Sequence, residues 1–194
     1  MIKSKQEYEY YLKADKIALG INDNGFQQKL KLAILPPPVW SFQKKLRKLE
    51  YYYNCKKGVF NKIYTYWLRY QFRKESIKLN FSIPTNVFGP GLAIVHYGTI
   101  IVNPMAKVGK NCRIHACVNI GASGGRKEAP QIGDNVYIGP GAKIYGDIAI
   151  GNCIAISANS CVSDSFHEES IMLAGMPAKK IKEIDISRLI KHVE

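Results

Sequence analysis

The side chains best suited to proton transfer in this 194-residue chain are its four histidines, His96, His115, His167 and His192. An unperturbed imidazole has a pKa of about 6.5. It can therefore take a proton from a hydroxyl group and return it to a leaving group at neutral pH. His96 and His115 lie in a repetitive part of the sequence that must position them, whereas His167 and His192 follow it and are expected at the surface.

The five cysteines, Cys55, Cys112, Cys117, Cys153 and Cys161, do not indicate a metal or disulfide site. Their number is odd, and no two have the C-x-x-C spacing that is typical of zinc ligands. We expect Cys112 and Cys117 to be small, buried and reduced, and we expect no metal. The polar N-terminus lacks the apolar core of a secretory signal, and no apolar run approaches the roughly 18 residues of a membrane span. These features predict a cytoplasmic location.

The formal net charge of +13 favours anionic partners such as nucleic acid, an anionic lipid surface, an acidic glycan or a phosphorylated cofactor. Much of this charge lies in residues 42–79, the basic aromatic segment, where eleven Lys and Arg stand against Glu50 and Glu75 and ten residues are aromatic. No recognisable nucleic-acid-binding motif is present, which argues against nucleic acid. Two interpretations remain: peripheral contact with a membrane, at its inner face, or aromatic packing on the protein or a neighbouring subunit with the cations outward.

Branched aliphatic residues recur at every sixth position in the second half of the chain. This period fits neither an α-helix, whose period is about 3.6 residues, nor a strand, whose period is two. A stretch rich in glycine, charge and proline at 124–131 is expected to form a protruding loop that preserves the register. The repeating positions are Val102, Val108, Ile114, Ile120, Ile132, Ile138, Ile144, Ile150, Ile156 and Val162.

A period of six predicts a parallel β-helix. Each hexad supplies one flat strand and a turn, three hexads complete a coil, aliphatic side chains stack inside, and Gly, Asn and Asp form the corners. Residues 82–165 would give roughly four to five coils. An ordinary β-sandwich with accidental spacing is the alternative, and the number of aliphatic residues in register argues against it. His115 lies about one coil beyond His96, so the two could be near neighbours.

The N-terminal residues have a helical character instead. Residues 4–19 predict a helix with Ser4 as N-cap and Glu7 completing a capping box. The "PPP" at 36–38 is expected to be a stiff extended joint.

Two further helices are predicted at 40–54 and 60–78. The second contains residues with helical spacing, namely Ile63, Trp67, Tyr70 and Lys74. The expected organisation is a helical N-terminal region (1–80), a β-helix domain (81–181) and a C-terminal tail (182–194).

Three separated motifs, in order and in register, resemble the hexapeptide-repeat acyltransferases, and within them the serine acetyltransferase-like branch. They are "GPGLAIVHYGTIIVNPMAKVGKNCRIHACVNIGASGG" (89–125), "IGDNVYIGPGAKIYGDIAIGN" (132–152) and "AGMPAKKI" (174–181). The resemblance implies a mainly β fold, a left-handed parallel β-helix, assembly as a homotrimer, and acetyl-CoA in a groove between subunits. The helical region looks like the appendages of capsule and exopolysaccharide members of that branch.

By this resemblance, His96 in "IVHYGTIIV" is the catalytic histidine, although Gly98 and Thr99 stand in a different order from the family's H-x-x-G. It would act as general base on a hydroxyl that attacks the thioester. The alternative is a buried filler, because counting back six from Val102 places His96 on an aliphatic position. His115 is a candidate second site residue, with a structural role as its alternative.

Two departures concern the acceptor. Serine acetyltransferases carry an aspartate before the catalytic histidine, where this chain has Val95, and a second histidine in "HPKI", where it has Ala129 in "APQI". Both differences argue against L-serine, because a zwitterionic amino acid needs dedicated polar partners.

The resemblance also places the cofactor. Pro140 and Ala158 should line the path of the pantetheine arm, and Ser163 and Lys179 should lie toward the nucleotide end. The expected function is acetyl-CoA-dependent O-acetylation of a hydroxyl-bearing small molecule or glycan, such as a sugar of a capsular or exopolysaccharide precursor. Serine O-acetylation and a non-catalytic trimeric scaffold are the alternatives.

Overall fold

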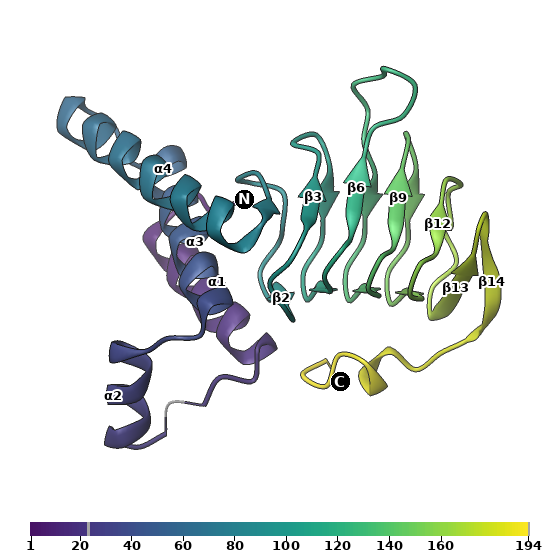
Figure 1. The fold of residues 1–194 in the computed structure, drawn as a ribbon, viewed down its shortest axis with the longest axis horizontal. Helices are drawn as coiled ribbons and strands as arrows, with labels where there is room; N and C mark the ends of the chain where they lie inside the picture. The colour runs from purple at the N-terminus through teal and green to yellow at the C-terminus, as the bar shows by residue number, and fades with distance from the viewer. Residues whose placement is uncertain (23, 194) are drawn as a thin grey trace.

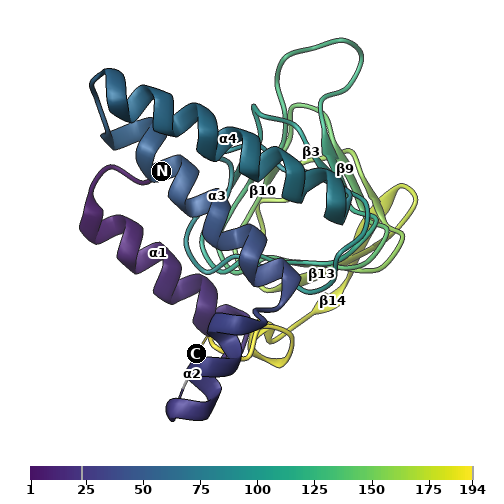
Figure 2. The same cartoon turned by 60° about the vertical axis from the view of Figure 1, so that its left-hand side comes forward.

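A computed structural model describes residues 1–22 and 24–193 of the chain. Within these residues, four α-helices precede a column of short parallel strands, and the C-terminal segment runs back along the outside of that column (Figure 1). Viewed closer to the column axis, the strands enclose a three-sided interior (Figure 2). The fold is a left-handed parallel β-helix with a helical N-terminal region, as the six-residue repeat and the resemblance predicted.

The strands form three sheets, one for each face of the prism. The first sheet contains β1 (Phe81–Ser82), β3 (Ile100–Val102), β6 (Asn119–Gly121), β9 (Lys143–Tyr145) and β12 (Cys161–Val162). The second contains β4 (Lys107–Val108), β7 (Gln131–Ile132) and β10 (Ala149–Ile150). The third contains β2 (Ala93–Ile94), β5 (Arg113–Ile114), β8 (Tyr137–Ile138), β11 (Ala155–Ile156), β13 (Ile171–Gly175) and β14 (Ala178–Glu183).

The aliphatic residues of the repeat are stacked coil upon coil. Ile114 pairs with Ile138, and Ile138 with Ile156, and all three are fully buried. Complete burial of such a side chain contributes roughly 1.5–3 kcal/mol, so each coil is stabilised mainly by its inward row. The loop between β6 and β7 protrudes from the column, yet Val108 still pairs with Ile132. The predicted register is therefore confirmed.

The corners of the coils need backbone conformations that few residues adopt. Asn111, Asn135 and Asn159 have φ values of 57°, 57° and 54°. Asparagine tolerates this left-handed region better than most side chains. In the turn that contains Asn135, a Cβ on Gly133 would lie 2.9 Å from the carbonyl oxygen of Gly151 in the next coil. The small and polar corner residues thus let successive coils approach closely.

The helices are α1 (Lys5–Ala18), α2 (Phe26–Ile34), α3 (Pro38–Cys55) and α4 (Val59–Leu79). The capping box of α1 is confirmed in part, since the Ser4 side chain accepts a hydrogen bond from the Glu7 amide. α2 was not predicted, and none of its residues is buried. Pro38 opens α3 rather than ending an extended joint, because proline fits the first helical position, whose amide has no partner inside the helix. None of the helices in the described ranges is long and apolar enough to cross a membrane.

α3 and α4 close the first coil of the β-helix. The ring of Phe42 in α3 lies 4.8 Å from that of Phe81 in β1 and 5.2 Å from that of Phe72 in α4. Gln43 is fully buried and donates to the Leu92 carbonyl (2.7 Å), and it accepts from the Ile94 amide (3.4 Å). These bonds satisfy backbone groups that an uncovered terminal coil would expose.

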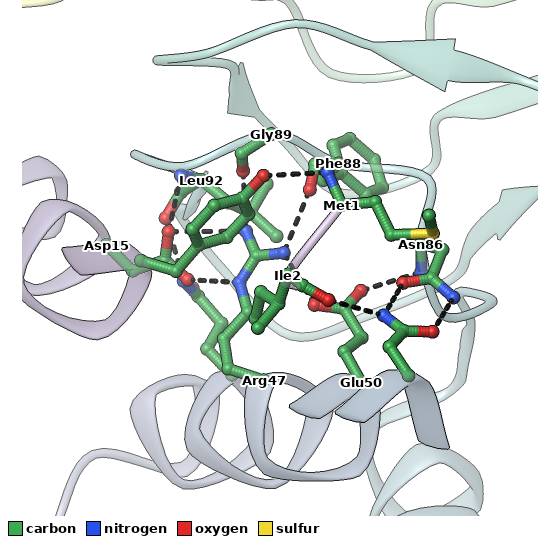
Figure 3. Close-up of polar contacts among 12 residues, drawn as sticks. Met1, Ile2, Asp15, Arg47, Glu50, Asn86, Phe88, Gly89 and Leu92 are labelled. Carbon is green, nitrogen blue, oxygen red and sulfur yellow. Dashed lines mark hydrogen bonds and ion pairs between the residues drawn. The ribbon is translucent and has the colours of Figure 1, made fainter. Parts of the chain in front are cut away.

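A buried charge network joins the helices to the same coil (Figure 3). Arg47 donates to Asp15 (2.8 Å), to Glu50 (3.0 Å) and to the carbonyl of Phe88 (2.9 Å). The Asp15 carboxylate also accepts from the Leu92 amide (2.9 Å). Burial by itself would lower the pKa of Arg47, but the charges of Asp15 and Glu50 and their hydrogen bonds outweigh it and raise that pKa. The arginine is therefore permanently charged and fixes α1 and α3 to the coil that carries His96.

The C-terminal segment covers the outer face of the third sheet. Beyond β14 a short 3₁₀ turn, Ile186–Arg188, leads to Ile190. Ile186 and Ile190 are buried with Ala155 of β11. This packing holds residues 184–193 against the column.

Candidate active site at one edge of the β-helix

The turns from the third sheet to the first stack along one edge of the prism. They consist of residues 95–99, 115–118, 139–142 and 157–160, and we call them the histidine edge. His96 lies in the first turn, directly above the coil of His115. The turns from the first sheet to the second form a different edge, the loop edge: 103–106, 122–130, 146–148 and 163–165.

His96 is exposed at the histidine edge. The aliphatic position that the hexad count assigned to it belongs to Ile94, which is fully buried and pairs with Ile114. The segment between Ile94 and Val102 is two residues longer than a hexad, so it bulges outward and carries the imidazole to the surface. The alternative of a buried filler is therefore wrong, and the ring is free to meet a substrate.

His115 lies in the next coil, beside His96. The ring centroids are 6.3 Å apart, and the ring of Tyr137 lies 5.1 Å from His115 on the other side. The Nε2 atom of His115 is buried and has no hydrogen-bond partner within the described part of the chain. The expectation that the two histidines are near neighbours is confirmed.

The electrostatic surroundings keep His115 neutral. Burial lowers its pKa from the ordinary value, and the positive charge of Arg113 and the nearby ring of His96 lower it further. A neutral imidazole can both donate and accept a hydrogen bond. At neutral pH His115 can therefore contact a polar group that is bound next to His96.

Three of the four proposed cofactor residues follow the histidine edge away from His96. Pro140 and Ala158 are exposed and stacked, and the Pro140 carbonyl accepts from the Asn159 amide (2.9 Å). Lys179 is exposed in β14 and pairs with Ala174, at the end of the third sheet that feeds this edge. Small residues thus lead from the imidazole to a lysine, an arrangement that fits a long thioester with an anionic end.

Ser163 is separated from this group. It follows β12 and lies on the loop edge, one face away from Pro140 and Ala158. A single groove on one copy of the chain cannot include all four residues. The six-residue repeat showed that Ser163 directly follows an inward aliphatic residue, Val162. It did not show on which of the three edges of the prism Ser163 lies.

Two residues differ from their expected environments. Cys112 is buried, as expected, but Cys117 is exposed on the histidine edge with φ of 63°. His192 is only partly exposed, with its Nε2 buried and without a hydrogen-bond partner among the described residues. Burial lowers the pKa of His192, and Arg113 lowers it further. No periodicity marked either position, because both depend on which segments pack together.

Within residues 1–22 and 24–193, no three His, Cys, Asp or Glu side chains come together in a way that could hold a metal ion. The chemistry that this edge offers is that of imidazole bases, backbone amides and a cationic end.

Comparison with known proteins identifies relatives of the same architecture. No family model matches the chain. It is 35% identical to a serine acetyltransferase of Mycobacterium tuberculosis over 100 residues, which make up 50% of this chain and 43% of that protein. The crystal structure of serine acetyltransferase from Brucella abortus superposes with a TM-score of 0.70 at 30% identity, over 93% of this chain and 71% of that one. The chain belongs to the serine acetyltransferase family.

A second structure of that Brucella abortus family member, in complex with coenzyme A, gives a TM-score of 0.72 at 30% identity over 93% of this chain and 70% of that one. The chain spans less than half the length of the Mycobacterium tuberculosis relative that it matches. Membership of the serine acetyltransferase family confirms the recognised resemblance and the β-helical fold.

Proposed function

We propose that this protein is an acetyl-CoA-dependent O-acetyltransferase with His96 as general base. The observation that carries the proposal is an exposed imidazole at the head of an edge lined by small residues, in a chain of this family. The Brucella abortus relative with bound coenzyme A supports the choice of co-substrate. The side chains at Pro140 and Ala158 leave room for an extended arm, and Lys179 offers a positive charge for phosphate.

Acetyl-CoA would supply the acetyl group as a thioester. His96 takes the proton from the acceptor hydroxyl as its oxygen bonds to the thioester carbon, and returns it to the thiolate when the C–S bond breaks. The products are the acetyl ester and the free CoA thiol, so atoms and charge balance. Backbone amides of the histidine edge are the donors available to the transient oxyanion.

We assign His115 a contact with the bound acceptor. Its neutral ring is beside His96, and its buried Nε2 has no partner within the described chain. A hydroxyl or amine next to His96 would satisfy that atom.

L-serine is the acceptor we propose to test first, because the relatives named above are serine acetyltransferases. A sugar hydroxyl of a capsular or exopolysaccharide precursor is a second candidate, and two residues favour it. Ala129 replaces the second histidine of the family and is buried (2% exposed), so it offers no polar group to a groove. Val95 offers no carboxylate to orient His96.

We also propose that the groove forms between two copies of a homotrimer. Ser163 on the loop edge of one copy would then face the histidine edge of a neighbouring copy. It would lie close to Pro140 and Ala158 of that neighbour. Sedimentation of the purified chain should give a trimer mass, and a monomer that retains full turnover would contradict this arrangement.

The function is tested by acceptor-dependent release of CoA thiol from acetyl-CoA, with L-serine, free sugars and nucleotide sugars as acceptors. We expect turnover with one acceptor class and its loss in His96→Ala, while His167→Ala, which changes an exposed histidine elsewhere, retains it. Turnover with a sugar and none with L-serine would move the acceptor to the second candidate. Absence of thiol release with every acceptor would favour a non-catalytic scaffold, and full activity of His96→Ala would remove His96 from the reaction.

A further inference from the structure

Most of α4 is not used to build the core. Only Leu68 and Leu79 of this helix are buried. The helix projects away from the β-helix beyond α3 (Figures 1 and 2). Among its residues, large apolar side chains are more than half exposed at Val59, Phe60, Ile63, Tyr66, Trp67, Tyr70 and Ile77.

These seven residues, the α4 stripe, lie on one side of the helix. Spacings of three, four and seven residues, as from Ile63 to Tyr66, Trp67 and Tyr70, place side chains on the same helical face. A face with this spacing is normally packed against a core. Here all seven side chains are more than half exposed, so in the single chain this face is not packed against the core.

The flanks of the α4 stripe carry only positive charge. Lys62, Arg69 and Arg73 follow one side of it, and all three are exposed. The only acidic residue of α4, Glu75, is ion-paired with Lys45 and mostly buried. The exposed surface of the helix therefore combines aromatic and aliphatic side chains with cations and lacks exposed carboxylates.

A cavity of about 790 Å³ adjoins the α4 stripe and shares Val59 and Tyr66 with it. It lies between the ends of α3 and α4 and the segment of Pro84. Its lining contains no carboxylate and four cationic side chains, those of Lys56, Lys57, Lys62 and Arg69.

We infer that the α4 stripe and this cavity are a docking surface for a bilayer that contains anionic lipid. Apolar side chains would enter the boundary between headgroups and acyl chains, Tyr and Trp would lie at headgroup level, and the flanking cations would contact lipid phosphates. Since α4 is not apolar enough to span a membrane, it would lie in the plane of the interface.

Charge decides between this partner and the others. If two copies of α4 met in a two-fold contact, Lys62, Arg69 and Arg73 of one copy would approach the same cations of the other, which is unfavourable. Nucleic acid would satisfy the cations but would leave the aliphatic members Val59, Ile63 and Ile77 without an apolar partner. An anionic bilayer matches both components of the surface.

The test is co-sedimentation of the full chain with vesicles of phosphatidylcholine alone or mixed with phosphatidylglycerol. We expect retention on the mixed vesicles and little on the neutral ones. Phe60→Ser with Trp67→Ser should abolish retention. The matched control, Phe26→Ser with Ile34→Ser on α2, also removes two apolar side chains that are more than half exposed, and it should bind as the unmodified chain does.

A second pair of variants tests whether binding to the vesicles depends on the cations beside the α4 stripe or only on the net charge of the chain. Lys62→Gln, Arg69→Gln and Arg73→Gln together should weaken binding to mixed vesicles on the order of 100-fold, since each cation near an anionic surface contributes about fivefold. Lys13→Gln, Lys29→Gln and Lys31→Gln remove the same charge elsewhere and should change it little. Thermal unfolding of each variant verifies that it is folded.

Three outcomes would overturn the inference. One is that Phe60→Ser with Trp67→Ser is retained on mixed vesicles as well as the α2 control. Another is that this variant changes its oligomeric mass but not its binding to vesicles, which would make the surface an interface between copies. The last is binding of a single-stranded RNA that depends on the same cations, without vesicle binding. The assay does not use acyl transfer, so its result is independent of the proposed enzymatic function.

Discussion

The imidazoles of His96 and His115 lie 6.3 Å apart, although they belong to successive coils of the chain. One ring is exposed, and the other is partly buried between it and Tyr137. This pairing makes the histidine edge the best candidate for chemistry in the molecule. It depends on the extra length of the turn after β2 and on the helices that hold the first coil.

Removal of His115 should reduce turnover without preventing folding. His115→Ala is expected to lower kcat/KM for the acceptor by more than it changes KM for acetyl-CoA, because His115 is assigned a contact with the acceptor. Loss of His96 should cost more, about 10²–10⁴ in kcat, the range for a general base. Steady-state kinetics with each substrate varied in turn measures both effects. An unchanged acceptor dependence in His115→Ala would contradict this assignment.

The stability of the fold should fall in mildly acidic solution. The pKa values of His115 and His192 are lowered from 6.5, mainly by burial, so the unfolded chain binds protons at a higher pH than the folded chain. Above the pKa that histidine has in the unfolded chain, about 6.5, the two histidines do not change the stability. As the pH falls below that value, protonation favours the unfolded chain and the folded state is destabilised. As the pH is lowered through this range, the unfolding midpoint should decline less in His115→Gln and in His192→Gln than in the unmodified chain. His167→Gln, at an exposed position, is the control, and an equal decline in all three would contradict the prediction.

The buried ion network should be essential to the helical cap. Arg47→Met removes the cation that contacts both Asp15 and Glu50, leaving two buried carboxylates uncompensated (Figure 3). Breaking one partner of such a buried pair typically costs about 3–5 kcal/mol. The exposed pair Lys110–Asp134 is the matched control, and Lys110→Met should cost about 0–1 kcal/mol. Urea unfolding measures both, and similar losses would show that burial of the network is not decisive.

Thiol reagents should distinguish two cysteines that the sequence did not separate. Cys112 is fully buried, and burial raises its pKa to about 12, whereas Cys117 is exposed on the histidine edge. We expect modification of Cys117 in the native protein and of Cys112 only after unfolding. Mass spectrometry after brief labelling gives the order. A bulky adduct on Cys117 should also inhibit thiol release, and Cys117→Ser should protect against that inhibition.

Bulk on the histidine edge should block the proposed cofactor path. Ala158→Leu is expected to raise KM for acetyl-CoA about tenfold or more with little change in the unfolding temperature, because the side chain is exposed. Ala33→Leu, an equally simple change at an exposed position of α2, should leave KM unchanged. If the two variants behave alike, the arm does not pass Ala158.

Much of this architecture could be predicted because it is local and repetitive. The interval of six placed Ile114, Ile138 and Ile156 in one buried row, and the structure confirms that row. Helices at 40–54 and 60–78 were also predicted, and they correspond to α3 and α4. α2 was missed although Phe26, Leu30 and Ile34 recur at every fourth position, a spacing that fits a helix. None of its residues is buried, so its apolar side contributes nothing to the core.

The candidate site was predictable only in part. Resemblance singled out His96, but the hexad count placed it inside the column, since a count of six cannot register a turn that is two residues too long. The spacing between His96 and His115 predicted that the two could be neighbours, but it did not predict that His115 is partly buried. Ser163 shows the same limit, because the edge on which a corner residue lies follows from the order of the faces.

The sequence by itself determined a three-sided column and its inward rows, because periodic burial of aliphatic side chains is a property of neighbouring residues along the chain. Only the tertiary structure decided which corners share an edge, which imidazole is exposed and which face of α4 is left uncovered. Those outcomes depend on turn lengths and on packing between distant segments, such as Arg47 against Asp15, and no local pattern encodes them.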